Sequence, residues 1–399
     1  MWAQIMLEQK KQPIKLYVAF FIFLTFGLSV SVVGRLTSNH VFGYGVANRF
    51  QWVDGTESSV QKALIAEVQD SLQGTDTTAK MADVKFKSEA ERKILAALKQ
   101  HDNRAVNATV YQAERQMPQL INDQRFNLNL FTQSVVQDSH AIYYSNRYMV
   151  KKKLNFVLDG IGLSAVLNHL MAVLGYEVFW SSPWVVGLPS IIIVIAIIMM
   201  VTAFFRDRHE HTDDFIELAP LNLLKQAAVK LGVSMVYLNL LLVGVGTIVL
   251  VVMRFFPNHP FGNWAFPYTV NILGEYVTYP LWVILLQYLF LANLWFGLIA
   301  SIAFCLSNLV HNQLIGMAVA AVVAFAQPLH LLTLLPPAAA RFMPGYYTNF
   351  VQITLHNNEF TDISLPNITA VFLVWAAAFW LIGSAVMTLR QHKYIPALA

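Results

Sequence analysis

Long apolar runs alternate with polar segments along the chain. Each run has about the 20 residues that a helix needs to cross the ~30 Å hydrocarbon layer of a bilayer. The pattern therefore predicts an all-α polytopic membrane protein with six transmembrane helices, at approximately 14–35, 183–205, 232–254, 280–306, 313–335 and 368–389.

The polar segment 36–182, between the first and second runs, is long enough to form a domain of its own. Alternating strand patterns are scarce in it, whereas apolar residues recur at helical spacing. We expect a mostly helical domain. The residues that define its apolar faces are Val60, Leu64, Val68 and Leu72, followed by Ala90, Ile94 and Leu98.

The stretch 154–180 is apolar enough to compete as a seventh span. It contains Asp159 and Glu177, and a charge inside the hydrocarbon layer costs several kcal/mol. We interpret the stretch as an interfacial or packed helix that leads into the second span.

Basic residues near the ends of the runs predict the orientation of the chain. Lys and Arg favour the cytoplasmic side. With both termini inside, nine basic residues near the span ends are cytoplasmic and two are outside; the nine are Lys10, Lys11, Lys15, Arg206, Arg208, Lys225, Lys230, Arg390 and Lys393. The chain is thus expected in the cell membrane, with 36–182 extracytoplasmic.

Two outer segments have unusual composition. Segment 255–280 is rich in Phe, Trp, Tyr and Pro, which suits a loop at the headgroup level. Segment 334–355 stays apolar after its prolines interrupt the helical pattern. Non-helical backbone at membrane depth persists only where protein buries it or it lines a cavity. We therefore expect a short re-entrant or interfacial helical piece there.

Composition narrows the function classes. The 399 residues are 56% hydrophobic and 13% charged, with a net charge of +4 and a single cysteine, Cys305. This balance gives no support for a nucleic-acid partner, and one cysteine excludes an internal disulfide or a cysteine metal cluster. The His and Asp residues at 209–214 are expected to be a solvated cluster, so no metal site is predicted. The first run exceeds the length of a cleavable signal core and is interpreted as a retained anchor.

The charged segment 206–230 lies between two apolar runs on the predicted cytoplasmic side. Thr212 or Asp213 is suited to cap a helix, and Pro220 breaks or restarts it. We expect a short amphipathic helix that docks another protein.

Here the chain resembles the permease subunits of type-2 ATP-binding-cassette exporters. In that family the second span is followed by an acidic residue, a short helix, a Leu-x-Pro element, a leucine pair and a lysine that opens the third span. The matching positions in this chain are Asp213, Asp214, Glu217, Leu218, Pro220, Leu223, Leu224 and Lys230. The large outer domain resembles that of Gram-positive members.

The resemblance implies a transport complex. Two permeases, of the same or homologous chains, would form the pathway, and cytoplasmic ATPase subunits would bind segment 206–230 as a coupling helix. The chain has no G-x-x-x-x-G-K-[ST] motif, so ATP and Mg are expected on the partner ATPase, with no cofactor or catalytic site here. The expected activity is export of a hydrophobic or amphipathic peptide, lipid or drug.

Polar residues inside the runs are candidates for the transport pathway. By default such residues face other helices and bond to them, and substrate contact is the alternative. Gln327 and His330 are the strongest candidates to line the pathway. The full set is Asn239, Gln287, Asn293, Gln327 and His330. Gly297 and Ser301 form a small-xxx-small pattern that predicts close helix packing.

Two other functions are alternatives to export. The chain could be a membrane sensor or immunity-type protein that binds a peptide through 36–182 and transports nothing. An intramembrane enzyme is disfavoured because Asp, His and Glu do not cluster at matching depths in the runs. The predicted layout is therefore 1–35 as cytoplasmic N-terminus and first span, 36–182 as outer domain, and 183–399 as the five-helix membrane part.

Overall fold

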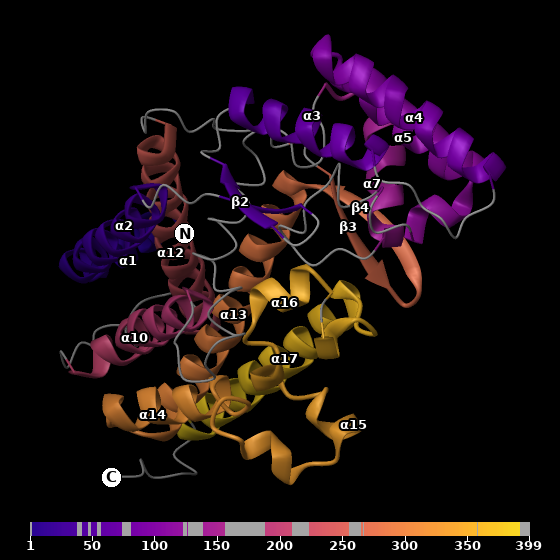
Figure 1. Ribbon diagram of the computed structural model, residues 1–399. Coiled ribbons are helices and arrows are strands. Elements are labelled where there is room, and N and C mark those ends of the chain that lie inside the picture. The colour runs from indigo at the N-terminus through magenta and orange to yellow at the C-terminus, as the bar shows by residue number, and fades with distance from the viewer. Residues whose placement is uncertain are drawn as a thin grey trace.

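The computed structural model describes residues 2–37, 42–46, 49–53, 57–73, 81–122, 126, 139–155, 188–209, 223–254, 265, 267–356 and 358–391. Helices dominate, and two antiparallel hairpins complete the fold (Figure 1). In chain order the first half contains α1 (Trp2–Lys11), α2 (Ile14–Thr37), β1 (Phe42–Val46), β2 (Arg49–Val53), α3 (Glu57–Gln73), α4 (Met81–Lys99), α5 (Asn103–Gln116), η1 (Pro118–Asn122) and α7 (Ser139–Lys152). The second half contains α10 (Leu188–His209), α12 (Leu223–Arg254), β3 (Pro267–Ile272), β4 (Glu275–Pro280), α13 (Leu281–Leu309), α14 (Gln313–Ala324), η2 (Leu331–Leu334), α15 (Pro337–Ala340), η3 (Pro344–Tyr346), α16 (Phe350–Thr354), η4 (Asn358–Phe360) and α17 (Leu365–Gln391).

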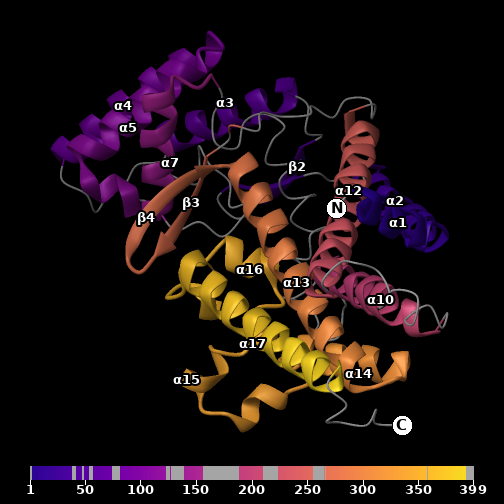
Figure 2. The ribbon, with the colours of Figure 1, turned by 180° about the vertical axis from the view of Figure 1, so that it is seen from behind.

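Four of the described helices, α10, α12, α13 and α17, are long and apolar enough to cross a membrane. A fifth candidate is the pair α1 and α2, which meets the same test only when its two bent parts are counted together. The protein is thus mostly helical, with several helices that are long and apolar enough to cross a membrane. Helix α13 lies centrally and packs against α10, α12, α14, α16 and α17 (Figures 1 and 2).

The bend between α1 and α2 measures 62° and falls at Pro13, whose ring nitrogen has no hydrogen to donate within a helix. Side chains fix the bend to its neighbours. The Gln12 amide donates to Ser234 Oγ on α12 at 3.4 Å, and the Arg206 guanidinium of α10 donates to the Lys11 carbonyl. The N-terminal helix is therefore tied to both spans that flank segment 206–230.

The segment 36–182, which is predicted to be extracytoplasmic and is called the outer region below, contains the helices α3, α4, α5 and α7. Its core includes Leu64, Val68, Ile94 and Leu98, each at most 2% exposed, so the burial inferred from spacing is confirmed for these residues. The β1–β2 hairpin was not predicted. Most of the ambiguous stretch 154–180 lies outside the described residues.

Residues 267–280 of the aromatic segment before α13 form a hairpin, which corrects the expectation of a loop for this part. Strands β3 and β4 pair from Pro267↔Pro280 to Ile272↔Glu275. The two-residue turn between them, Leu273–Gly274, has positive φ at both positions, 54° and 89°, as a type I′ hairpin turn requires. Because β4 ends at Pro280 and α13 begins at Leu281, the hairpin continues directly into a membrane helix.

The outer region is bonded to this hairpin. Ser145 of α7 shares a hydrogen bond of 2.6 Å with Thr269 of β3, and Thr269 shares one of 2.8 Å with Thr278 of β4. Beside this hydroxyl chain, the Tyr144 ring stacks on the Tyr276 ring at 5.1 Å. The α7 helix is thus joined through the hairpin to α13.

The fifth apolar run differs from the prediction of one helix over 313–335. Helix α14 ends at Ala324, turns follow through residue 330, and His330 has a left-handed φ of 57°. Pro328 has no N–H to donate to the Ala324 carbonyl, so the helix cannot continue through it. At 12 residues, α14 is shorter than the length needed to cross a bilayer.

The prolines of segment 334–355 have the predicted local effect. The chain from Leu331 to Thr354 folds into the short pieces η2, α15, η3 and α16 rather than one helix. That this segment re-enters the membrane stays a prediction.

Candidate functional site

A pocket of about 700 Å³ lies between the α15 region and the first turns of α17. One wall is a single stripe of α17, because its lining residues recur at intervals of three and four: Asn367, Ala370, Val371, Val374 and Trp375. The facing wall and the two ends are lined by Pro337, Ala338, Arg341, Phe342, Tyr347, Asp362 and Ile363. The pocket is mostly apolar with a small set of polar groups, as ligand sites usually are.

Two features of the sequence place the facing wall. Pro336 is the N-cap of the four-residue helix α15 and Pro337 is its first residue, so the prolines determine where this short helix begins. The indole N–H of Trp375 then donates to the Phe342 carbonyl at 2.7 Å. This bond across 33 residues holds the two walls at a fixed separation.

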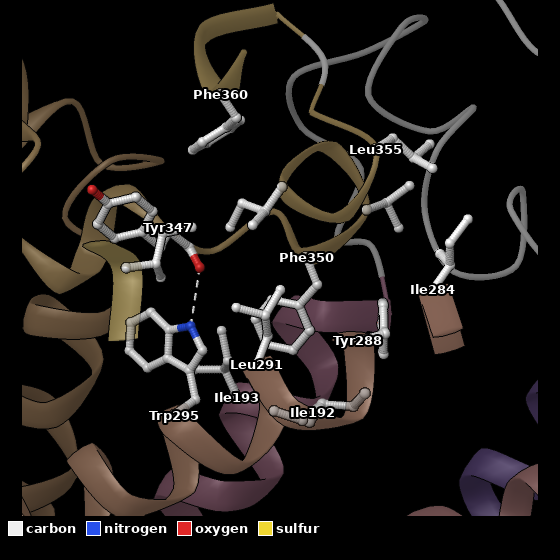
Figure 3. Packing of buried hydrophobic residues seen from close by; sticks show 14 of the residues in the cluster. Ile192, Ile193, Ile284, Tyr288, Leu291, Trp295, Tyr347, Phe350, Leu355 and Phe360 are labelled. Carbon is white, nitrogen blue, oxygen red and sulfur yellow. Dashed lines mark hydrogen bonds between the residues drawn. The ribbon is translucent and has the colours of Figure 1, made fainter. Parts of the chain in front are cut away.

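Tyr347 joins the pocket to the buried core. Its carbonyl accepts a 3.0 Å hydrogen bond from the Trp295 indole of α13, drawn as the dashed line in Figure 3. Its own hydroxyl donates to the Arg341 carbonyl at 2.7 Å. Around this bond, Phe350 packs edge-on against Tyr288 with ring centres 5.2 Å apart (Figure 3). The pocket therefore has a rigid base, because Trp295 and Phe350 are fully buried.

The charged end of the pocket contains a loose ion pair. Arg341 Nη2 and Asp362 Oδ2 are 3.8 Å apart, and the side chains are 45% and 64% exposed. Exposed pairs of this kind contribute little to stability, typically 0–1 kcal/mol. A second carboxylate, Glu359, and Arg341 both interact with the Tyr346 hydroxyl. Both partners of the ion pair thus remain available to a charged ligand at low cost.

Two of the predicted pathway residues come together. Asn239 of α12 and Asn293 of α13 each donate an amide N–H to the other's carbonyl oxygen, at 2.7 and 2.9 Å. Each also donates to a carbonyl one turn earlier in its own helix, Met235 and Leu289. They form the interhelical bonding that was expected by default for polar residues in the spans.

The other predicted pathway residues lie apart from this pair. Gln287 is half-buried on α13. Gln327 is in the turn after α14, and His330 is exposed. Their side chains are not among those that line the pocket. Their role in a transport pathway stays a prediction.

Most of the predicted coupling residues, Asp213, Asp214, Glu217, Leu218 and Pro220, lie outside the described residues.

The remaining two coupling residues, Leu223 and Leu224, are the first residues of α12, so they begin a continuous helix that runs to Arg254. Nearby, the Lys230 ammonium lies 5.7 Å from the centre of the Phe204 ring of α10. In the part of the chain that the structure describes, no three His, Cys, Asp or Glu side chains are placed to hold a metal ion.

Sequence reasoning missed the pocket residues Arg341, Asp362 and Trp375. The pocket-lining residues of α17 have helical spacing in the sequence. Every face of an apolar span has similar apolar residues, so this spacing does not single out the face that lines the pocket. What makes the pocket is the folding back of the α15 region, and no local pattern indicates which helix it meets.

Comparison of the chain with protein-family models, with curated proteins and with solved structures finds no match in any of the three.

Proposed function

We propose that the chain is the membrane-spanning permease subunit of an ATP-binding-cassette exporter. It would move a hydrophobic or amphipathic substrate outward, driven by ATP hydrolysis on a separate cytoplasmic subunit. The observation that carries the proposal is the pocket beside α17, where an apolar stripe on a spanning helix faces an exposed Arg341–Asp362 pair. Such a site suits an amphipathic cargo.

Two further features support the proposal. Helices α10 and α12 flank segment 206–230 and are linked beside it through Lys230 and Phe204. The N-terminal helix is bonded to both. A force applied to this segment by a partner ATPase would therefore reach two spans and α1 together. The inward-facing termini belong to the same proposal, as does a six-span layout in which α14 and the short pieces after it, rather than one helix, make the fifth crossing.

The test is purification of the chain together with the product of any neighbouring gene that encodes a P-loop ATPase, followed by ATP hydrolysis measured in nanodiscs. Glu217→Lys and Pro220→Asp are expected to lower the ATPase activity that depends on the permease, with the spans still folded. The matched control is Glu89→Lys, which makes the same charge change at an exposed residue that pairs with Lys93. Normal coupling in both segment variants, or absence of any co-purifying ATPase, would refute the proposal.

A second candidate function is a membrane sensor that binds a peptide through its outer domain. The direct connection from α7 through the β3–β4 hairpin to α13 favours it, because ligand binding outside would act on a spanning helix. The sensor needs no ATPase. It predicts that a bound peptide alters cysteine accessibility in α13 in the absence of ATP.

A further inference from the structure

The pocket beside α17 has a gradient of polarity along the helix axis. The spanning part of α17 begins at Leu365, and Asn367 lies in its first turn beside the Arg341–Asp362 end of the pocket. Trp375 lies ten residues beyond Leu365, a rise of about 15 Å at 1.5 Å per residue. This is half of the ~30 Å hydrocarbon layer. The pocket therefore runs from the headgroup level to the hydrocarbon interior, and its polarity changes in the same direction as that of the bilayer.

The apolar part of the pocket is open at its side. Phe342 and Val374, which line it, are both 67% exposed, and the adjacent Leu373 is 59% exposed. Leu373 and Val374 are on α17, and on a helix that spans the bilayer such side chains meet lipid chains rather than water. A molecule already in the bilayer can thus reach the pocket without leaving the hydrocarbon layer.

The polar end presents both signs of charge. An arginine guanidinium binds phosphate through paired N–H donors, and the Asp362 carboxylate accepts hydrogen bonds from an ammonium group. Because the two groups are 3.8 Å apart and largely exposed, a ligand with a phosphate and an amine separated by a short linker can engage both at once. A ligand with only an anionic group would leave Asp362 facing a like charge.

From the polarity gradient, the side opening and the paired charges we propose that this pocket binds a zwitterionic phospholipid of the surrounding bilayer. The phosphate lies at Arg341, the headgroup amine at Asp362, and one acyl chain along Val371, Val374 and Trp375. The volume of about 700 Å³ accommodates the headgroup and the upper part of one chain. The inference that this lipid is the transported cargo rests on the proposed function. The inference that the pocket binds the lipid does not, because binding needs no ATPase.

The experiment measures lipid binding to the purified full chain in detergent by native mass spectrometry, without any ATPase. Phosphatidylethanolamine and phosphatidylglycerol with identical acyl chains are titrated separately. We expect phosphatidylethanolamine to bind more tightly. Arg341→Gln should weaken both lipids by about tenfold, as loss of a charge-assisted hydrogen bond predicts. Asp362→Asn should weaken only phosphatidylethanolamine and remove the preference.

A matched pair of variants tests the location. Ala370→Trp fills the pocket from the α17 wall and should abolish the preferential binding. Ala377→Trp makes the same change on the same helix at an exposed residue outside the pocket lining and should leave it intact. Thermal unfolding of each variant shows that it folds. If Ala370→Trp binds like the unmodified chain, or if Asp362→Asn leaves the preference unchanged, the inference is wrong.

Two other results separate the alternatives. Competition by free glycerophosphoethanolamine at equal concentration would identify a soluble solute as the occupant and overturn the assignment to a bilayer lipid. ATPase assays in nanodiscs of the two lipids then test the cargo role. Lipid binding without a coupled ATPase would refute the proposed function but support the lipid site. A coupled ATPase without lipid binding would support the proposed function but refute the lipid site.

Discussion

Asn239 on α12 and Asn293 on α13 hydrogen-bond to each other in both directions, with N···O distances of 2.7 and 2.9 Å. Each amide uses its second N–H within its own helix, so the pair satisfies both its donors and its acceptors. A polar group in a spanning helix that lacks such a partner is costly. The pair therefore fixes the rotation of α12 and α13 relative to each other.

Replacement of Asn239 by Leu should destabilise the membrane part by about 0.6–2 kcal/mol, the range measured for interhelical hydrogen bonds. Asn293→Leu should have a similar effect, because each variant leaves the other amide unpaired. The double variant should cost less than the sum. Equilibrium unfolding in mixed micelles measures the coupling, and Thr247→Val serves as control, since that exposed hydroxyl bonds only within α12. Strict additivity of the two single changes would contradict the prediction.

Glu114 of α5 should make the outer region less stable as the pH rises. The side chain is fully buried, and burial raises its pKa to about 8 against the opposing hydrogen bond from Asn146. The unfolded chain loses this proton near 4.5, whereas the folded chain keeps it until about 8. Between these values the unfolded state binds fewer protons, so the free energy of unfolding decreases with pH and levels off above about 8.

Glu114→Gln should remove that pH dependence. The charged and titratable groups near the carboxylate include Tyr143 with its neighbours Tyr111 and Arg147, and none of them is changed by the substitution. Hydrogen exchange of the α5 and α7 amides in the full chain, from pH 5 to 9 and corrected for intrinsic rates, is the measurement. Glu89→Gln is the exposed control. An unchanged pH profile in Glu114→Gln would count against the buried acid as its source.

Thr269→Val should loosen the outer region from α13. Thr269 is 3% exposed and bridges Ser145 and Thr278, and valine has the same shape without the hydroxyl. The buried Ser145 hydroxyl and the half-buried Thr278 hydroxyl then each lose a partner, and the loss costs about 1–3 kcal/mol for the buried group. Faster hydrogen exchange in α7, β3 and β4 is expected, with α12 unaffected. Thr388→Val, an exposed hydroxyl bonded within α17, should change nothing.

Gly345→Ala should displace η3 from the end of α14. A Cβ at this position would lie 2.7 Å from the Val323 carbonyl oxygen and 2.9 Å from Ala326 Cβ, and backbone atoms cannot easily move away. Gly297→Ala is the matched control, because a Cβ there meets no described atom within 4 Å, and alanine is the better helix former. Thermal unfolding in detergent should show a loss for the first variant and none for the second.

The positions of the glycines show that small-residue spacing alone does not predict which helices pack closely. Gly297 and Ser301 have the pattern of a close helix contact, yet the close approaches are at Gly316, Gly345 and Gly383, where an added Cβ would be 2.9 Å or less from a neighbouring atom. The Ser301 hydroxyl instead bonds to the Gly297 carbonyl in its own helix. A short pattern identifies residues that permit contact, but the partner helix determines which of them are used.

The apolar runs on which the spanning helices lie, and the helical faces of the outer region, follow from the sequence. Both depend on transfer of side chains from water and on the helical repeat, which are local properties. The break after Ala324 also has a local cause, because Pro328 cannot donate a helical hydrogen bond. The sequence did not show whether this one proline would end the helix within an otherwise apolar run, and the structure does. The pairing of β3 with β4 had only a weak signal, Leu273–Gly274, in place of the usual Asn-Gly.

The sequence by itself determined that this is a mostly helical protein, and it located the apolar runs of the four helices that are long enough to cross a membrane. Only the tertiary structure decided that Arg341 meets Asp362, that Trp375 holds Phe342, and that α7 reaches α13 through a hairpin. The physical reason is that hydropathy and backbone propensity act over one or two helical turns. Contacts between residues tens of positions apart depend instead on how the whole set of apolar faces packs together.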